Sequence, residues 1–331
     1  MPHKISFDKA KASKLFRLKH QSSYKNNYKA LDNKSLPFVS PNGRSTDFVL
    51  TTPFVKGCPL NCSYCYVTRR NNSYDENYKP FPSNPINIAT DVDDMLSSIK
   101  HFVDTLPATK SPNQCHPVYY TLDIGEYSDM LSPNFTTLTN YIISQLVPYK
   151  TLATSFASKI STPTHVKRLI DCPIPYKARI RASVSPQWVI TQTEVGTASI
   201  VDRLNGLNLA FDKGYEVHLN FSPMIITNTF EDDYSQLMKL IRSIVSKDVL
   251  NQLQYEGIFL THNRKLHIMN ERFFPTNSES LLWTPHNQEL AQNLRNNEKI
   301  RYIWSVRSKY ITLFRSLISQ YLPECKERYL F

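Results

Sequence analysis

The chain has 331 residues, of which 41% are hydrophobic and 20% are charged, and its formal net charge is +11. This globular composition provides enough apolar residues for a sizeable core, in one large domain or two small ones. No apolar run approaches the roughly 20 residues needed to cross a bilayer, and the N-terminal segment lacks the apolar stretch of a secretion signal. We therefore expect a cytoplasmic protein with no membrane partner.

The first predicted element, residues 1–45, is a basic N-terminal extension. Its basic residues, from Lys4 to Lys34, are opposed only by Asp8 and Asp32. A basic segment of this kind favours a polyanionic partner such as nucleic acid. A solvated, partly disordered tail explains the same charge pattern. Both interpretations stay open on sequence alone.

From residue 46 to about 300, apolar β-branched runs alternate with amphipathic stretches. The expected strands are Phe48–Val55, Val118–Ile124, Leu152–Phe156, Ala178–Val184, Glu216–Phe221 and Ile258–Thr261. The expected helices are Val92–Thr105, Pro133–Val147, Thr164–Ile170, Ala198–Asp212, Asp232–Val245 and Gln288–Leu294, with Thr197 as the N-cap of the fourth. Alternation at this spacing is typical of parallel βαβ units.

The predicted fold class is α/β, a partial (β/α)6 barrel, because the strands are too few for the eight-stranded barrel of about 250 residues. Residues 301–331 follow as a small C-terminal element, with a helix over Lys309–Tyr321. This element either closes the barrel or contacts nucleic acid. Tyr302, Trp304 and Arg307 make its start basic and aromatic, which suits base stacking as well as ordinary helix packing.

The strongest chemical signal is a cysteine motif directly after the first expected strand. Cys58, Cys62 and Cys65 follow the pattern C-x3-C-x2-C. Thiolates are the usual ligands of iron–sulfur clusters, and three of them hold three irons of a cubane while the fourth iron stays open for a ligand. A structural zinc site needs four ligands. Zinc and chance spacing are the weaker interpretations.

This motif, with the aromatic Tyr64 before its last cysteine, resembles that of the radical S-adenosylmethionine (SAM) superfamily. The resemblance implies a [4Fe–4S] cluster and SAM as cofactors, with reductive cleavage of SAM to a 5′-deoxyadenosyl radical. Tyr64 then either contacts the adenine or packs the cluster loop. Gly125-Glu126, at the end of the second strand, is similar to the Gly-Gly-Glu segment that binds the SAM amino group in this superfamily.

Within the superfamily, the chain from about residue 48 to 331 resembles spore photoproduct lyases. Tyr64 and Tyr66 flank the last cysteine as in those lyases, and Ser128-Asp129 matches their Ser-Asp pair. Further similar segments are Ala157-Ser158-Lys159, Ser183-Val184-Ser185, Glu194-Val195-Gly196-Thr197 with Asp202-Arg203 beyond, Phe221-Ser222-Pro223 and Thr261-His262. The resemblance implies that Lys159 contacts the SAM carboxylate and that Ser128 and Ser183 belong to the SAM site.

Spore photoproduct lyases repair a thymine pair in DNA, and a cysteine just before the Ser-Asp pair returns a hydrogen atom together with the two tyrosines. Here Glu126 takes the place of that cysteine. A carboxylate cannot donate a hydrogen atom as a thiol can, so the resemblance leaves two activities open. One is lyase-type repair. The other is an isomerase acting on hypermodified thymidine of bacteriophage DNA, virus-encoded and active in the host cytoplasm.

Tyr64, Tyr66 and Glu126 are therefore the candidate catalytic residues, DNA the expected substrate, and a reduced flavodoxin or ferredoxin the expected electron donor. Two other classes of protein remain as alternatives. A non-catalytic iron–sulfur protein that binds nucleic acid needs the cysteines but no SAM pocket. A radical SAM enzyme acting on a small molecule needs both, without DNA.

Overall fold

The computed structural model describes the chain in several stretches, namely residues 21–24, 49, 51, 53–65, 67, 86–109, 116–273, 279–292 and 298–331. Tyr66 and nearly all of the predicted N-terminal extension lie outside these residues. The predicted domain boundaries at residues 45 and 300 stay predictions. Within the described stretches, no helix is long and apolar enough to span a membrane.

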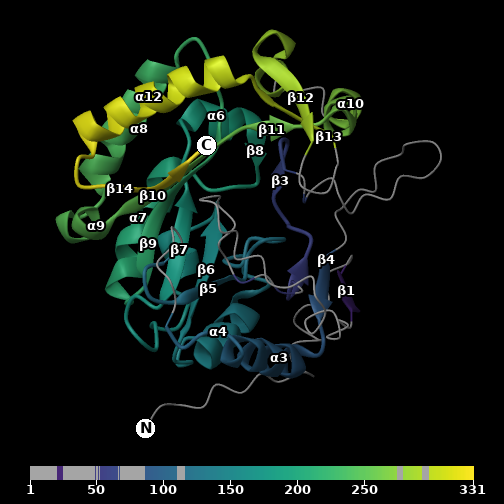
Figure 1. The fold of residues 1–331 in the computed structure, drawn as a ribbon, viewed down its shortest axis with the longest axis vertical. Helices are drawn as coiled ribbons and strands as arrows, with labels where there is room; N and C mark the ends of the chain where they lie inside the picture. Colours follow the sequence, from purple (N-terminus) through teal and green to yellow (C-terminus); the bar gives the residue numbers. More distant parts are fainter. Residues whose placement is uncertain are drawn as a thin grey trace.

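A curled sheet of six parallel strands forms the centre of the described chain (Figure 1). In order across the sheet, the strands are β14 (Lys326–Leu330), β10 (Gln254–Phe259), β9 (Glu216–Met224), β7 (Ala178–Ser183), β6 (Leu152–Ser158) and β5 (Tyr120–Asp123). Every neighbouring pair is parallel. The prediction of a partial parallel barrel is confirmed.

The first and last strands differ from expectation. Of the predicted strand Phe48–Val55, the structure places Val49 beside β5 in a single parallel bridge to Leu122, and Val55 in the short β2 (Val55–Lys56). The sixth strand of the sheet is instead β14, from the C-terminal tail, which pairs with β10.

Helices cover the outer side of the curled sheet (Figure 1). Those that follow or connect the strands are α3 (Val92–Asp104), α4 (Thr136–Leu146), α5 (Pro163–Val166), α6 (Gln187–Thr193), α7 (Ile200–Asp212), α8 (Phe230–Ile244), α9 (Lys247–Gln252) and α12 (Trp304–Tyr321). Apolar strand residues such as Phe156, Ile180 and Leu219 are fully buried. Burial of this apolar surface is the main force that holds the helices to the sheet.

Three smaller sheets and two helices complete the described fold. They are the sheet of β1 (Gln21–Tyr24), β4 (Ile86–Ala89) and β2, the pair of β3 (Asn61–Cys62) and β8 (Glu194–Val195), the sheet of β11 (Thr261–His262), β13 (Glu298–Tyr302) and β12 (Gln288–Gln292), and the helices α10 (Arg264–Phe273) and α11 (Glu279–Leu282). A 3₁₀ turn, Pro285–Asn287, precedes β12.

Two local predictions were wrong. The expected helix Gln288–Leu294 is a strand over its described part, because β12 pairs antiparallel with β13 and Glu289 forms an ion pair with Arg301 at 2.9 Å. Cross-strand pairing here overrides helix propensity. The N-cap of α7 is Ser199, whose side chain accepts the N–H of Asp202. The Thr197 hydroxyl bonds instead to Glu194 and Arg203.

Helix α7 lies unusually close to the loop that follows β6. A Cβ atom built on Gly206 would be 1.7 Å from the carbonyl oxygen of Ser161. Only glycine permits this approach, since any side chain would overlap the backbone of the loop. The close contact fixes the position of Arg203, one turn earlier on α7, over the carboxyl end of the sheet.

Charged side chains gather on the inner face of the sheet. Arg181 on β7 pairs with Asp123 on β5 and with Glu256 on β10, at 2.5 Å and 3.0 Å. Arg328 on β14 pairs with the second oxygen of Glu256 at 2.8 Å. Burial opposes the charge on Glu256, but Arg181 and Arg328 outweigh it and lower its pKa to about 2. Paired charges therefore bridge the strands across the interior.

His218, in the same interior, makes the stability of the protein pH-dependent. Its ring is fully buried, with Glu216 at 2.9 Å and Arg328 at 3.4 Å. Burial and the charges of Arg179 and Arg328 lower the pKa of His218 from 6.5 to about 3, although Glu216 opposes the shift. The folded chain therefore keeps this imidazole neutral, while the unfolded chain protonates it below pH 6.5.

We expect the free energy of unfolding to decrease as the pH falls from 6.5 toward 3, with a loss of about 2 kcal/mol from this group at pH 5. Urea titrations at a series of pH values measure the slope. Above pH 4.5, the carboxyl groups whose pKa values are lowered contribute little to the slope of the unfolding free energy against pH. The His218→Gln variant should show a clearly flatter profile between pH 7 and pH 5. An unchanged slope in this variant would contradict the assignment.

Candidate functional site

The cysteine loop, residues 57–65, begins after β2 and includes the short β3, and its first two cysteines are buried. Gly57 precedes it with φ of 95°, a conformation that favours glycine and turns the chain into Cys58. Cys58 and Cys62 are buried and Cys65 is half-buried. The backbone N–H groups of Leu60 and Asp129 donate to the Cys58 sulfur. Because Asp129 follows β5, this contact places the loop at the carboxyl end of that strand.

A second anchor holds the loop to the segment after α6. Strand β3 pairs antiparallel with β8, with Cys62 opposite Glu194. The Ser63 N–H donates to the carbonyl oxygen of Thr193 at 2.8 Å. A third contact comes from α10, where the Asn270 side-chain amide donates to the Ser63 carbonyl oxygen at 2.7 Å. The cysteines are thus fixed by segments from three distant parts of the chain.

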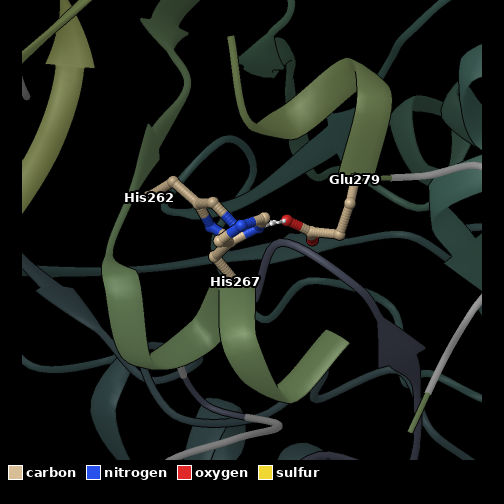
Figure 2. Close-up of side chains that lie close together, drawn as sticks. All are labelled: His262, His267 and Glu279. Carbon is tan, nitrogen blue, oxygen red and sulfur yellow. Dashed lines mark hydrogen bonds and ion pairs between the residues drawn. The ribbon is translucent and has the colours of Figure 1, made fainter. Parts of the chain in front are cut away.

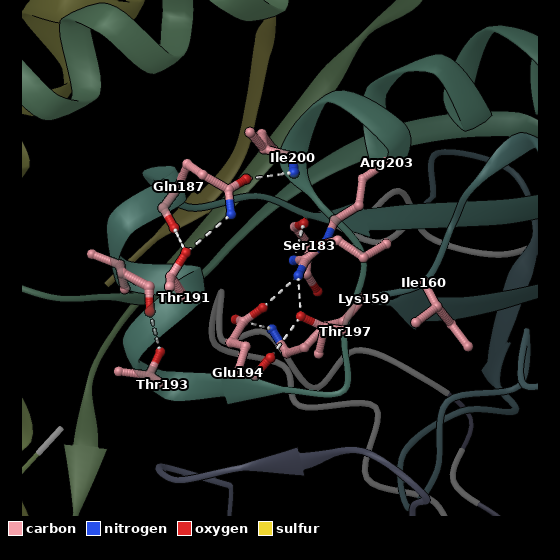
Figure 3. A network of polar contacts seen from close by, with 12 residues as sticks. Lys159, Ile160, Ser183, Gln187, Thr191, Thr193, Glu194, Thr197, Ile200 and Arg203 are labelled. Carbon is pink, nitrogen blue, oxygen red and sulfur yellow. Dashed lines mark hydrogen bonds and ion pairs between the residues drawn. The ribbon is translucent and has the colours of Figure 1, made fainter. Parts of the chain in front are cut away.

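Glu194 is the centre of the polar network beside the loop (Figure 3). Its carboxylate is buried and accepts from Lys159 at 3.0 Å and from Arg203 at 2.6 Å. The Tyr64 hydroxyl donates to the same oxygen as Lys159. Burial alone would raise the pKa of Glu194, but Lys159 and Arg203 reverse this and lower it to about 2. Glu194 is therefore ionised and joins the cysteine loop to β6 and α7.

Arg203 supports this carboxylate from a fully buried position. Besides Glu194, its guanidinium donates to the carbonyl oxygens of Ser183 and Ala198, each at 3.0 Å, and to the Thr197 hydroxyl at 2.8 Å. The planar guanidinium suits several simultaneous hydrogen bonds of this kind. Arg203 therefore orients Glu194 and does not itself reach the cysteines.

Lys159 directly follows β6 and lies between the cysteine loop and β9. Its ammonium group contacts Glu194 and the Ser222 carbonyl oxygen, the latter at 3.2 Å, and lies 5.3 Å from the centre of the Tyr64 ring. Asp129 fixes the same strand end, because it accepts from the Lys159 N–H at 2.7 Å and from the Ser158 hydroxyl at 3.1 Å. Asp129 thereby links the segment after β5 to the end of β6, next to Cys58.

The structure describes the predicted site residues other than Tyr66, and their environments differ. Gly125 and Glu126 lie in the turn after β5, where Gly125 N–H donates to Asp123 at 2.9 Å and Glu126 is exposed. Ser128 is buried, and its hydroxyl has no hydrogen-bond partner among the described residues. Ser183 ends β7 and is buried. All of them lie at or after the carboxyl ends of parallel strands, where barrels of this type bind ligands. Their individual roles stay predictions.

The thiols and their surroundings fit an iron–sulfur cluster. The three sulfurs belong to one short loop, and Cys58 already receives the two N–H donors that stabilise a thiolate. Burial, and next the charge of Asp129, raises the pKa of Cys58 to about 12, and burial also raises the pKa of Cys62. Such thiols ionise only when a cation replaces the proton, which is what iron ligation does.

Sequence reasoning missed the central role of Glu194 and the contact from Asn270. Glu194 was noted only as part of a similar segment, and nothing in its neighbours predicts a partner at Lys159, 35 positions away. Asn270 carried no signal, because it reaches Ser63 across 207 positions. Both contacts depend on the order of strands in the sheet.

A partial parallel barrel with a three-cysteine loop at the carboxyl ends of its strands is the architecture of the radical SAM class. Residues 33–330 match the family model described as spore photoproduct lyase. The chain therefore belongs to the spore photoproduct lyase family.

Two curated relatives are both named spore photoproduct lyase. The protein of Bacillus subtilis (strain 168) is 23% identical over 209 residues, and that of Clostridium acetobutylicum is 21% identical over 224 residues. These matches cover 62% and 63% of this chain, but only 54% and 55% of the relatives. This chain thus matches little more than half the length of either relative.

Solved structures of spore photoproduct lyase share the fold. A mutant with bound AdoMet and dinucleoside spore photoproduct superposes with a TM-score of 0.76 at 17% identity, covering 98% of this chain and 86% of its own. A complex with dinucleoside spore photoproduct gives 0.75 at 18% identity, covering 100% and 88%. At these identities the likeness concerns the fold.

Proposed function

We propose that this chain is a radical SAM enzyme that acts on a thymine-derived base in DNA. The observation that carries the proposal is the convergence of the cysteine loop, Lys159 and the turn after β5 at one end of a parallel barrel of the spore photoproduct lyase family. When bound, a [4Fe–4S] cluster on Cys58, Cys62 and Cys65 supplies the electron that splits SAM into methionine and a 5′-deoxyadenosyl radical.

The surrounding residues provide groups for both ends of SAM. The Lys159 ammonium, which pairs with Glu194 at 3.0 Å, is our candidate partner for the SAM carboxylate. Gly125 and Glu126 offer backbone and carboxylate to the SAM amino group, and the buried Ser128 hydroxyl offers a further hydrogen bond. Tyr64, held by Glu194, lies beside the Lys159 ammonium and is our candidate for contact with the adenine or the substrate.

DNA as the substrate is supported by family membership and by charge. The net charge is +11, and solved relatives hold dinucleoside spore photoproduct. Trp304, at the start of α12, is 62% exposed, and the Arg307 guanidinium lies 5.1 Å from its ring. An exposed aromatic beside an arginine suits stacking on a base and contact with phosphate. A reduced flavodoxin or ferredoxin remains our proposed electron donor.

We propose two alternative reactions on such a base, and the presence of Glu126 bears on the choice between them. Repair of a photoproduct by a lyase-type reaction follows from the family. An isomerase of hypermodified thymidine, encoded by a bacteriophage, is favoured by Glu126 at the place of the hydrogen-donating cysteine, because an isomerase recovers its hydrogen atom from 5′-deoxyadenosine and needs no thiol. The exposed Glu126 lies at the site end of β5 in either case.

One experiment tests the proposal in steps. Anaerobically reconstituted protein is incubated with dithionite and SAM, with or without dinucleoside spore photoproduct, and the products are separated by chromatography. We expect 5′-deoxyadenosine in both reactions and thymidine release only with a repair enzyme. Absence of 5′-deoxyadenosine would refute the enzyme and favour a non-catalytic iron–sulfur protein.

The substrate class needs a second measurement. Duplex DNA binding, followed across a salt series, should weaken steeply as salt rises, because phosphate contacts release counterions. A flat response favours a small-molecule substrate. Mass spectrometry of nucleosides from DNA made with and without the protein then distinguishes modification from repair.

A further inference from the structure

Two histidines and a glutamate converge next to the cysteine loop without a role in the proposed chemistry (Figure 2). They are His262 on β11, His267 on α10 and Glu279 on α11, and one ligand atom from each lies within 4.8 Å of the others. The His262 side chain is fully buried, while those of His267 and Glu279 are 15% and 11% exposed. This is the one such group of ligating side chains found among the described residues.

The spacing of these atoms is close to that of a bound metal ion. Glu279 Oε2 lies 3.2 Å from His262 Nε2 and 2.6 Å from His267 Nδ1. Ligands at the usual zinc distances of about 2.0–2.1 Å are separated by roughly 3.3 Å in a tetrahedron. The distance of 3.2 Å between Glu279 and His262 agrees with this separation, and the distance of 2.6 Å between Glu279 and His267 would have to lengthen by less than an ångström. Two imidazoles and one carboxylate are also a donor set that zinc accepts.

Neighbouring groups orient each ligand from outside. Glu271 lies 3.5 Å from the other ring nitrogen of His267, and the Asn270 amide donates to the other oxygen of Glu279. The Trp283 ring stacks on His267 with 4.1 Å between centroids and 3° between planes. A carboxylate on the far nitrogen of a ligating histidine is a recurrent support in metal sites, because it fixes the tautomer and the ring orientation.

The charge of the group also favours a cation. Burial raises the pKa of Glu279, but hydrogen bonds from His262, His267 and Asn270 more than reverse this and lower it, so that the group is a carboxylate. A divalent ion would compensate this charge in a partly buried position. It would also cross-link α11 to β11 and α10.

We propose that His262 Nε2, His267 Nδ1 and Glu279 bind one divalent ion of the zinc type, with water in a fourth position. Asn270 connects this ion to the cysteine loop, since the same amide nitrogen donates to Glu279 and to the Ser63 carbonyl oxygen. The ion thereby braces α10 against the loop that carries the cysteines. The site is separate from the cluster and does not depend on the substrate.

The test uses protein with its cluster reconstituted, so that iron occupies the three cysteines before zinc is added. After excess metal is removed, zinc per chain is measured by mass spectrometry and the zinc ligands by X-ray absorption at the zinc edge. We expect one zinc per chain with only nitrogen and oxygen neighbours near 2.0–2.1 Å, and no sulfur at about 2.3 Å. Sulfur neighbours, or protein that retains no zinc, would overturn the proposal and leave a hydrogen-bonded cluster.

Variants extend the test to individual residues. His267→Gln and Glu279→Gln should remove most of the bound zinc. Glu271→Gln should weaken zinc binding about 10-fold, as loss of an outer support does. His286→Gln, at an exposed histidine outside the group, is the matched control and should bind zinc as the wild type does. Unchanged binding in His267→Gln and Glu279→Gln would also refute the site. Formation of 5′-deoxyadenosine is measured in parallel. It tests the proposed enzyme activity, whereas the zinc content tests the metal site, so failure of one proposal can be told from failure of the other.

Discussion

Replacing Cys58, Cys62 or Cys65 by alanine should abolish both cluster binding and SAM cleavage. Three thiolates are the minimum for three irons of a cubane, and removing one leaves an iron without a protein ligand. The iron and sulfide content after anaerobic reconstitution measures the first effect. Production of 5′-deoxyadenosine under dithionite measures the second, and we expect it to fall to the background without enzyme.

Cys172→Ala is the matched control for these variants. Cys172 is a free thiol whose sulfur donates to the Ile174 carbonyl oxygen, away from the cysteine loop. This variant should keep its iron and its activity. Full activity in any one of the three loop variants would show that the proposed cluster ligands are wrong.

Arg203→Met should destabilise the fold by about 3–5 kcal/mol, since it leaves a buried carboxylate without one of its two cations. Arg203 and the Glu194 side chain are 0% and 1% exposed, and the same substitution also removes donors to the carbonyl oxygens of Ser183 and Ala198. Urea unfolding of the apo-protein measures the loss. We also expect weaker cluster retention, because Glu194 holds the strand that pairs with Cys62.

Two further variants separate the buried charge from the loss of packing. Arg242→Met removes an exposed arginine whose bidentate partner is Glu324, and should have a far smaller effect. The double variant Arg203→Met/Glu194→Gln removes both charges, so its cost should be less than the sum of the single losses. Additive losses would contradict a direct pairing of the two residues.

The strands of the central sheet show how far local pattern predicts this fold. The sequence pattern located the strands Ala178–Ser183 and Glu216–Met224 to within one and three residues. The pattern fails at Lys326–Leu330, a short edge strand with two exposed residues that resembles an ordinary tail. It fails again at Gln288–Gln292, where helix-forming residues adopt a strand because the neighbouring strand pairs with them.

The candidate site likewise has some features that the local sequence predicts and others that it does not. By itself, the sequence determined the spacing of Cys58, Cys62 and Cys65 and the parallel βαβ order, because both depend on residues that are near one another along the chain. Only the tertiary structure brought Glu194 to Lys159 and Arg203, and Glu279 to His262 and His267. Those contacts follow from which strands are neighbours and which loops leave the same end of the sheet, and this choice is made by burial of the whole apolar surface rather than by any local run of residues.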